Sequence, residues 1–225
     1  MEEKDFERIV KKSKEKFIDH EEKINLAHRW DHVERVINNC KKILQLEESH
    51  IKSNRADGDI VILSAILHDA GRYRENEKDE KGKEKGHEYW SAKIAEDILK
   101  TSIKECNLDI DFESVKKIID IIRYHSEYDE TKMDEKIKSI YNLIEFKILT
   151  DADKIDSFGP IGIIRASLDE DYQGSAEKQL NHIKAKCDPK KYLLRTYGGN
   201  ELGKEYKKYL CDFTKIYEEQ KNIGI

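Results

Sequence analysis

The sequence predicts an all-α protein, and three observations support this expectation. Only Pro160 and Pro189 interrupt a backbone of 225 residues, and proline is the residue that a helix interior tolerates least. Apolar residues recur with the period of an amphipathic helix. No segment sustains the alternation of polar and apolar residues that is typical of a half-buried strand. The length suits one large domain, and we expect a single helical domain over 1–225.

The first three predicted helices follow from the apolar pattern. Residues 2–19 place their apolar side chains in rough helical register. A second helix is expected over 32–46, where Asp31 could cap the N-terminus. The break "SNRADGD" at 53–59 separates it from a third helix over 60–69. Apolar residues surround this third helix on nearly all sides, so we expect it to lie buried at the centre of the fold.

Glycine, proline and charge set the remaining boundaries. Residues 75–86, "ENEKDEKGKEKG", are expected to form a charged, solvated loop. Gly159 and Pro160 mark a turn within "DADKIDSFGPIGI", and Gly198-Gly199 is expected to be a simple turn. Further helices are predicted over 88–105, 113–126, 134–150, 162–186 (as one helix or two) and 201–221.

The charge pattern disfavours several classes of partner. The chain has 42 basic and 47 acidic residues, a net charge of −5, and its opposite charges are interleaved. It therefore lacks the basic stripe of a nucleic-acid-binding protein and the polybasic patch of a membrane-surface protein. No apolar run approaches the ~20 residues that span a bilayer. The charged N-terminus lacks the apolar core of a signal peptide. We expect a cytoplasmic protein with a small-molecule substrate, no membrane partner, and nucleic acid disfavoured.

The cysteines give a separate indication of the redox state. Cys40, Cys106, Cys187 and Cys211 are far apart in the sequence and form no C-x-x-C pair. In a cytosolic chain of this length we expect reduced thiols rather than a disulfide framework.

Five polar residues lie near helix ends at positions where the pattern predicts burial. His68, for example, follows Val61 and Ser64 by seven and four residues and so continues an apolar helix face. One histidine on such a face is usually a hydrogen-bonded core residue, but five positions beside a further carboxylate, Asp69, favour a common purpose. The five are His32, His68, His87, His125 and Asp151. By contrast, His20, His50 and His182 have polar neighbours and are expected at the surface.

A shared divalent cation would satisfy this set of buried polar groups. Each group left without a partner would cost about 1–3 kcal/mol. Neutral imidazole and carboxylate suit Mn, Fe, Co, Ni or Zn, and Mg is also compatible. Ligands on facing helices inside a bundle are a common way to build such a site. Residue spacing alone does not select the metal.

Five segments around these residues occur in a specific order. They are "HRWDHVERV", "AILHDAGR", "HEYWSAKIAEDIL", "IIRYHS" and "LTDADKIDSFGPIGIIR". Together they resemble the motifs of the HD-domain superfamily of metal-dependent phosphohydrolases, in particular its small bacterial and archaeal members. The resemblance covers about residues 26–168 and would leave 169–225 as a C-terminal helical extension. The family fold is an all-α bundle, which agrees with the independent helical prediction.

The resemblance implies a ligand set for the main metal ion. His32, His68, Asp69 and Asp151 would bind it. Asp151 is preferred to Asp153 because it is the first acid of "DADKID". Asp153 and Asp156 would then be structural residues or would support the ligands.

The resemblance also raises the question of a second ion. In two-metal branches of the family, histidines corresponding to His87 and His125 hold a second ion, and the aspartate of the His-Asp pair bridges both ions. Asp69 would then be the bridging residue. In the other case, His87 and His125 would contact substrate phosphate or a water molecule. One ion or two is left open.

The function that the resemblance implies is hydrolysis of a phosphoester or phosphoanhydride through a metal-activated water. Asp69 could accept the proton of that water or orient it. Arg72, one turn after Asp69, could stabilise phosphate charge, with His28 and Lys154 as further substrate-binding candidates. Arg35 could support the site through a salt bridge. The expected substrate is a nucleotide or another small phosphorylated metabolite.

Two alternative functions are left open. A subset of HD-fold proteins with the same histidines and aspartates are di-iron oxygenases. A non-catalytic HD domain could instead bind nucleotides. No P-loop and no G-x-G-x-x-G motif is present, which disfavours a kinase or dinucleotide-binding fold of those types. A homo-oligomer is compatible with the aromatic segment "YLLRTYGGNELGKEYKKYL", which could close the core or pack a dimer.

Overall fold

The computed structural model describes residues 1–50, 56–106, 108–126, 133–170, 172, 174–189 and 192–223. Within these residues the chain forms ten α-helices, three short 3-10 helices and no β-strand, apart from a single bridge between Lys78 and Glu84. The all-α prediction is confirmed. The helices are α1 (Glu3–Asp19), α2 (Trp30–Ser49), α3 (Gly58–Leu67), α4 (His87–Cys106), α5 (Phe112–Tyr124), α6 (Glu135–Tyr141), α7 (Ile144–Asp156), α8 (Gly159–Leu168), α9 (Ala176–Ala185) and α10 (Tyr197–Asn222).

Helix α3 is the buried centre of the upper part of the molecule, as its apolar sequence predicts. It contacts α1, α2, α4, α5 and α7, and Val61, Leu63 and Leu67 are fully buried. Asp57 begins the helix by accepting hydrogen bonds from the backbone N–H groups of Asp59 and Ile60. The segment that leads to the His-Asp pair is therefore held on every side by other helices.

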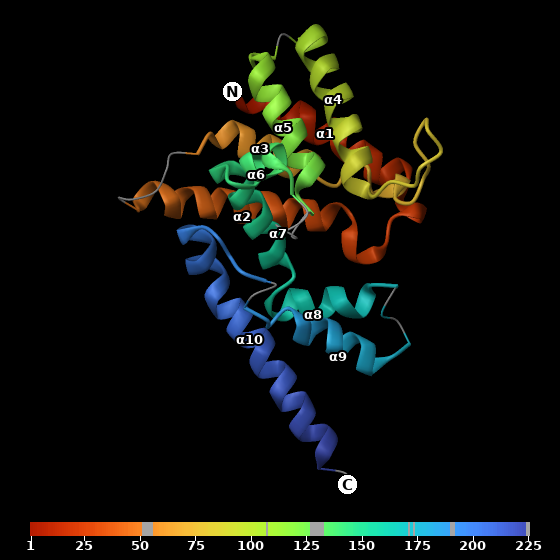
Figure 1. Cartoon of the computed structure of the whole chain (residues 1–225), viewed down its shortest axis with the longest axis vertical. Helices are drawn as coiled ribbons and strands as arrows, with labels where there is room; N and C mark the ends of the chain where they lie inside the picture. Colours follow the sequence, from red (N-terminus) through yellow and green to blue (C-terminus); the bar gives the residue numbers. More distant parts are fainter. Residues whose placement is uncertain are drawn as a thin grey trace.

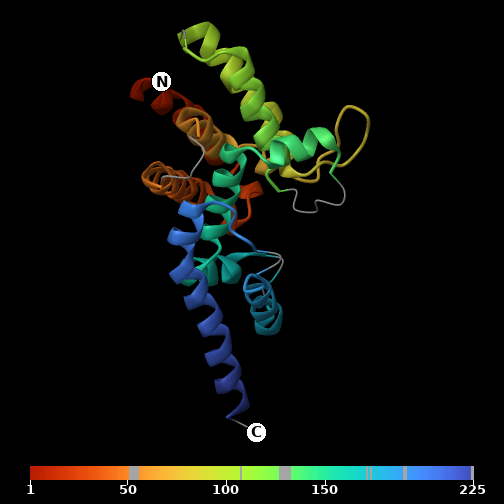
Figure 2. The same ribbon diagram turned by 60° about the vertical axis from the view of Figure 1, so that its left-hand side comes forward.

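Figures 1 and 2 show the arrangement of the helices from two directions. α2 crosses the middle of the molecule and packs against both α7 and α10. α8 and α9 lie beside α10. In both views the C-terminal part of α10 projects away from the remaining helices, and the two chain ends lie far apart.

The predicted helix over 134–150 is two helices. Leu143 adopts an extended conformation and begins α7, so α6 and α7 are separate. Apolar residues continue to recur with the helical period across this break, so the sequence pattern did not indicate that one helix ends and another begins. α7 then runs on to Asp156, which makes the acidic motif helical. The predicted turn begins only at Ser157.

Gly198 and Gly199 lie in the first turn of α10, where a simple turn was expected. A Cβ atom at Gly198 would lie 2.7 Å from the backbone oxygen of Ile43, and one at Gly199 would lie 2.4 Å from Oδ2 of Asp151. Both distances are too short for any side chain. The glycines therefore allow α10 to approach α2 and α7 closely.

Cys187 and Cys211 form a disulfide, which corrects the expectation of reduced thiols. Their Cα atoms are 5.7 Å apart although 24 residues separate them in the sequence. The packing of α9 against α10 brings them together, and spacing alone does not indicate such a contact. Cys40 is buried and free.

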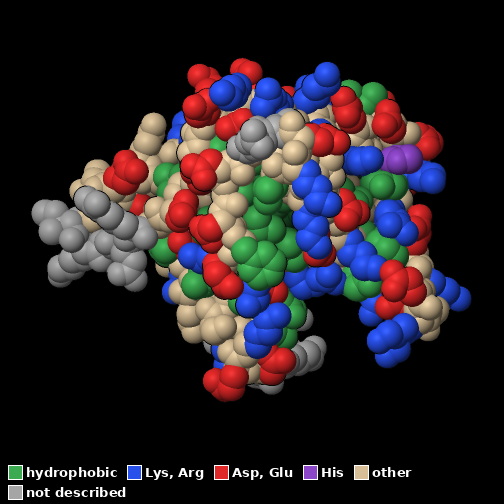
Figure 3. Space-filling view, turned by 90° about the horizontal axis from the view of Figure 1, so that it is seen from above, with side chains coloured by type: hydrophobic (Ala, Val, Ile, Leu, Met, Phe, Trp, Pro, Cys, Tyr) green, Lys and Arg blue, Asp and Glu red, His purple; other side chains and the backbone are tan. Residues whose placement is uncertain are grey.

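The surface shows the interleaved charge that the composition predicts. On the face seen in Figure 3, basic and acidic side chains are interspersed rather than separated into single-sign areas. In the described part of the chain, none of the helices combines the length and the apolar character that crossing a bilayer requires.

The disulfide predicts that stability depends on the redox state. Reduction should lower the free energy of unfolding by about 2–4 kcal/mol, because it frees a loop of this length in the unfolded chain. Urea unfolding of the wild-type protein with and without dithiothreitol measures this. The double variant Cys187→Ser/Cys211→Ser should give one value in both buffers. Equal stability of the oxidised and reduced wild-type protein would contradict the pairing.

Candidate metal centre

The carboxylate of Asp69 lies at the point where the ends of four helices meet. His32 is in the first turn of α2, His68 follows the last residue of α3, His87 is the first residue of α4, and His125 follows the last residue of α5. Asp69 is 1% exposed. Helix ends rather than helix middles therefore supply the polar groups, and they do so inside the protein.

Of the four histidines at these helix ends, two face each oxygen of Asp69. Oδ2 lies 3.8 Å from Nε2 of His32 and 3.8 Å from Nε2 of His68. Oδ1 lies 3.5 Å from Nε2 of His87 and 3.9 Å from Nε2 of His125. The rings form a continuous series, with centroid distances of 5.5 Å for His32–His68, 5.3 Å for His68–His125 and 5.2 Å for His87–His125. The carboxylate thus divides the four rings into two pairs.

The opposite nitrogen of each ring is held by an oxygen. Nδ1 of His68 and Nδ1 of His125 each lie 2.8 Å from the backbone oxygen three residues earlier, of Ala65 and Ile122 respectively. A carbonyl oxygen only accepts, so Nδ1 donates and Nε2 keeps a lone pair. Nδ1 of His32 lies 2.7 Å from Oδ2 of Asp156. These contacts select the tautomer that binds metal ions through Nε2.

His87 is oriented by a residue that sequence reasoning missed. Its Nδ1 lies 3.2 Å from Oε1 of Glu75, at the start of the charged loop. Arg72 also contacts Glu75, at 3.1 Å. The loop expected only to be solvated therefore begins with a carboxylate that orients a candidate ligand. No spacing signal in the sequence distinguishes Glu75 from its many acidic neighbours.

Asp153 joins this cluster, whereas the structure does not bring Asp151 into it. Oδ1 of Asp153 lies 3.3 Å from Nε2 of His32. The two aspartates are two residues apart on α7 and therefore point in directions about 200° apart around the helix axis. Only one of them can face His32, so the geometry replaces Asp151 with Asp153 as the candidate ligand.

Asp151 has a different set of partners. Its carboxylate accepts hydrogen bonds from the backbone N–H of Arg195, at 2.9 and 3.0 Å, and from the N–H and hydroxyl of Thr196, at 2.8 and 2.7 Å. It is fully buried. The predicted burial is thus confirmed, but the carboxylate fastens α7 to the beginning of α10.

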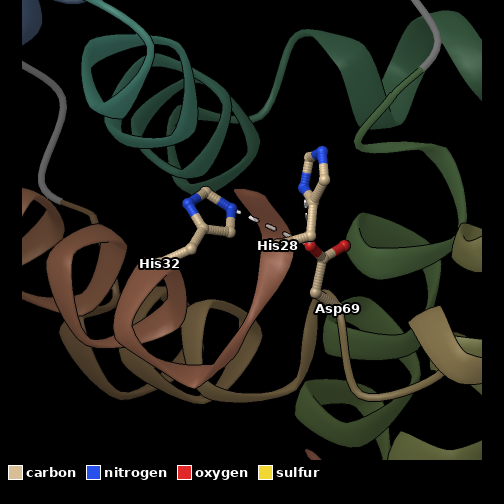
Figure 4. Close-up of side chains that lie close together, drawn as sticks. All are labelled: His28, His32 and Asp69. Atoms are coloured by element: carbon tan, nitrogen blue, oxygen red, sulfur yellow. Dashed lines mark ion pairs between the residues drawn. The ribbon is translucent and has the colours of Figure 1, made fainter. Parts of the chain in front are cut away.

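Three groups of side chains place one ligand atom each within 4.8 Å of one another. They are His32 with His68 and Asp153, Asp69 with His87 and His125, and His28 with His32 and Asp69. Figure 4 shows the last group, in which His28 and His32 approach Asp69 from one side. Nδ1 of His28 is 3.8 Å from Oδ2 of Asp69. The first two groups share no residue, so they could serve two ions.

Two unpartnered atoms show that the residues fit a cation. Nε2 of His68 and Oδ1 of Asp69 are buried and form no hydrogen bond within the part of the chain that the structure describes. Such atoms are costly to bury and each calls for an explanation. Both lie at the centre, where bound divalent cations would supply the partner that each atom lacks.

The protonation states also suit a cation. Burial and then the neighbouring His87 and His68 lower the pKa of His125 to about 3, and burial lowers the pKa of His68. Burial alone would raise the pKa of Asp69, but the charge of Arg72 holds that pKa well below its usual value. His68 and His125 therefore offer neutral imidazoles, and Asp69 offers an ionised carboxylate.

The pKa of His32 differs in direction from those of His68 and His125. Burial and Arg165 act to lower its pKa, but hydrogen bonds to Asp153 and Asp156 outweigh them and raise it. A cation bound at Nε2 would compete with a proton there.

Asp156 orients His32 and also binds two arginines. Besides His32, its carboxylate accepts hydrogen bonds from Nε of Arg35 at 2.6 Å and from an N–H of Arg165 at 2.9 Å. The salt bridge expected of Arg35 is thus present. Arg165 was missed by the sequence reasoning, because nine residues and a turn separate it from Asp156.

The remaining predicted residues lie at the edge of the centre. The guanidinium of Arg72 donates hydrogen bonds to Oδ2 of Asp69 at 3.2 and 3.3 Å. It therefore binds this carboxylate rather than extending into the solvent. Nζ of Lys154 donates to the backbone oxygen of Leu193 at 3.1 Å. Lys154 and His28 border a cavity, and Arg72 does not.

This cavity of about 180 Å³ opens directly beside Asp153 and His28. Its lining is rich in cationic side chains, and it includes His182, which is partly buried although the sequence suggested a surface position. The lining residues are Ala27, His28, Asp153, Lys154, Ser157, Arg165, Ala166, Asp169, His182, Lys186 and Tyr192. A small anionic molecule would fit both its size and its charge.

Comparison with known proteins identifies similar chains. A sequence profile described as HD domain matches residues 29–157. No curated protein matched the chain. A solved structure from Lactobacillus plantarum is 20% identical, with a TM-score of 0.63 over 99% of each chain.

Two further solved structures have the same arrangement of helices. An HD-superfamily hydrolase from Bacillus thuringiensis is 24% identical, with a TM-score of 0.59 over 96% of each chain. Bacillus subtilis YpgQ, solved in complex with ADP, is 20% identical, with a TM-score of 0.59 over 96% of this chain and 97% of YpgQ. At these identities the likeness shows a common fold.

The two aspartates of α7 should respond differently to substitution. Asp153→Asn should weaken Mn²⁺ binding by roughly tenfold or more, since it removes a charged ligand. Asp151→Asn should change Mn²⁺ affinity little but lower the free energy of unfolding by about 1–3 kcal/mol, because it disturbs bonds to Arg195 and Thr196. Calorimetric Mn²⁺ titration and urea unfolding of both variants measure the two effects.

Circular dichroism serves as the control that both variants are folded. Loss of Mn²⁺ affinity in Asp151→Asn, with normal affinity in Asp153→Asn, would contradict the geometric assignment.

Proposed function

The chain belongs to the HD-domain family, and on that premise we propose that it is a metal-dependent phosphohydrolase with two divalent cations at its centre. The observation that carries this proposal is the division of the four histidines by Asp69. One carboxylate oxygen faces His32 and His68, and the other faces His87 and His125. A carboxylate so placed is suited to bridge two ions.

The proposed ligands fall into two sets joined by Asp69. His32, His68, Asp69 and Asp153 would hold one ion, and Asp69, His87 and His125 would hold the other. Mn, Fe, Co, Ni and Zn all suit this mixture of imidazole and carboxylate. Bound cations would supply Lewis acidity to a phosphoryl oxygen and would lower the pKa of a water molecule from ~15.7 towards ~7.

The side chains around the ligands determine their orientation. Asp156, held by Arg35 and Arg165, fixes the ring of His32. Arg72 holds the Asp69 carboxylate in place and neutralises part of its charge. A group of carboxylates this close together would repel one another without these three arginines. The arginines therefore allow the acidic ligands to be buried together.

The cavity beside Asp153 supports a small phosphorylated substrate. Lys154, Arg165 and Lys186 are among its lining residues, and phosphate oxygens are suited to such cations. The ADP complex of the similar YpgQ supports a nucleotide in particular. We propose a nucleotide or another small phosphorylated metabolite, bound with one phosphoryl group at the metal centre.

Metal stoichiometry tests the two-ion centre. Protein stripped with chelator and reloaded with Mn²⁺ should contain two ions per chain, and His125→Ala should contain about one, because only the second ligand set is damaged. Inductively coupled plasma mass spectrometry after desalting measures the content. One ion in both proteins would leave a mononuclear site and refute the bridging role of Asp69.

A substrate screen tests the reaction itself. The Mn²⁺-loaded protein should release phosphate or pyrophosphate from nucleotides or phosphorylated metabolites, and His68→Ala should lose at least about 10²-fold of that activity with the loss of a ligand. Phosphate and pyrophosphate are assayed separately. A matched anaerobic iron-loaded sample is assayed for oxygen uptake. Substrate-dependent oxygen consumption without phosphate release would replace hydrolysis with an oxygenase reaction.

A further inference from the structure

Lys186 is a largely buried lysine whose ammonium group has no partner among the described residues. It follows the last residue of α9 and is 4% exposed. Its backbone N–H bonds to the oxygen of Ile183, but its ammonium group forms no hydrogen bond or ion pair within the described residues. The side chain lines the cavity beside Asp153. Burial, followed by the nearby charge of Arg165, lowers the pKa of Lys186 to about 8.

The other cations of the cavity are already committed to protein groups. Arg165 donates to Asp156 at 2.9 Å and to the backbone oxygen of Ala27 at 2.9 Å. Lys154 donates to the backbone oxygen of Leu193. Among the lining cations that the structure describes, Lys186 is therefore the one whose donors are available. The Lys186 side chain is largely buried and lines the cavity, so its ammonium group can meet an anion there that supplies the acceptor.

His182 and Asp169, which also line the cavity, do not take the place of Lys186 in binding an anion. His182, one turn before Lys186 on α9, stacks on Tyr172 with a centroid distance of 4.0 Å. Burial, followed by the charge of Lys186, lowers the pKa of His182 to about 4, so this ring does not compete for an anion as a cation. Asp169 is engaged by Asn25, whose amide lies 3.1 Å from Oδ1 of Asp169.

We propose that Lys186 binds a second anionic group of the substrate, separate from the phosphoryl group at the metal centre. Asp153, a candidate metal ligand, and Lys186 both line the cavity. The substrate class is therefore a compound with two anionic groups, such as a nucleoside diphosphate or a phosphorylated carboxylic acid. This proposal rests on the proposed phosphohydrolase function, because that function places the first phosphoryl group.

The disulfide contributes to the position of this side chain. Cys187, the next residue, is bonded to Cys211 on α10. α9 and α10 are therefore joined at the residue that follows Lys186. Lys186 acts as a specificity-determining residue held at a fixed place rather than on a free loop.

The test uses Lys186→Met, which keeps most of the side-chain length and removes the charge. The control is Lys178→Met, an exposed position on the same helix. Lys186→Met should retain or gain thermal stability, because the largely buried side chain becomes apolar and loses no partner among the described residues. Its Mn²⁺ content should equal that of the wild-type protein. A loss of folding or of metal would be visible in these two measurements.

Binding and turnover are measured with substrates of different charge. ADP and 3-phosphoglycerate each carry two anionic groups, and p-nitrophenyl phosphate carries one. For Lys186→Met, kcat/KM should fall by roughly 10- to 100-fold for the preferred two-anion compound, the range expected for a lost charged hydrogen bond. The fall should exceed that for p-nitrophenyl phosphate by about tenfold. Comparison of ADP with 3-phosphoglycerate distinguishes a phosphate from a carboxylate as the second anion.

Calorimetric titration of the Mn²⁺-loaded proteins separates two kinds of failure. If the wild-type protein hydrolyses none of these compounds but binds ADP, weaker binding by Lys186→Met supports the anion site and refutes hydrolysis. If the wild-type protein is active and Lys186→Met matches Lys178→Met with both two-anion compounds, the Lys186 assignment is overturned. Equal losses for one-anion and two-anion substrates would also overturn it, because Lys186 would then contact the reacting phosphoryl group.

Discussion

The burial of the Asp69 carboxylate is the constraint on which the remaining structure depends. An ionised carboxylate that is 1% exposed is stable only where positive charge or hydrogen-bond donors replace water. Arg72 supplies part of this compensation at 3.2 Å, and the four histidine rings surround the rest. One end of each helix that carries a ring must therefore lie beside Asp69. This requirement constrains how the helices pack around α3.

Helix ends are well suited to this task. The last carbonyl groups of a helix lack intrahelical partners. His68 and His125 each bond the carbonyl three residues earlier through Nδ1. The same contact completes the helix end, selects the tautomer and directs Nε2 towards Asp69. Local helix chemistry and site geometry are thus produced by a single hydrogen bond at each position, and little of the ring orientation is left to the surrounding side chains.

Charge balance extends from the centre to the cavity. Asp156 is buried between Arg35 and Arg165, and this group holds His32. The same Arg165 reaches the cavity that Lys186 also lines. Arg165, which helps to orient the candidate ligand His32, and Lys186, which would select a substrate, therefore line the same cavity. A substrate anion beside Lys186 would lie within the electrostatic field that also stabilises the ligands.

The sequence by itself determined the helical class, the central position of α3 and the burial of His32, His68, His87, His125 and Asp151, because the period of an α-helix reveals which side chains face the core. It also supplied the order of motifs that identifies the family. Only the tertiary structure shows that Asp153, and not Asp151, faces His32. This difference depends on how α7 is rotated about its axis relative to α2 and α10. The sequence pattern predicts that a side chain is buried, but it does not predict which neighbour that side chain contacts. Glu75, Arg165 and Lys186 were missed for the same reason, since each acts on residues distant in sequence or lies among many similar charges.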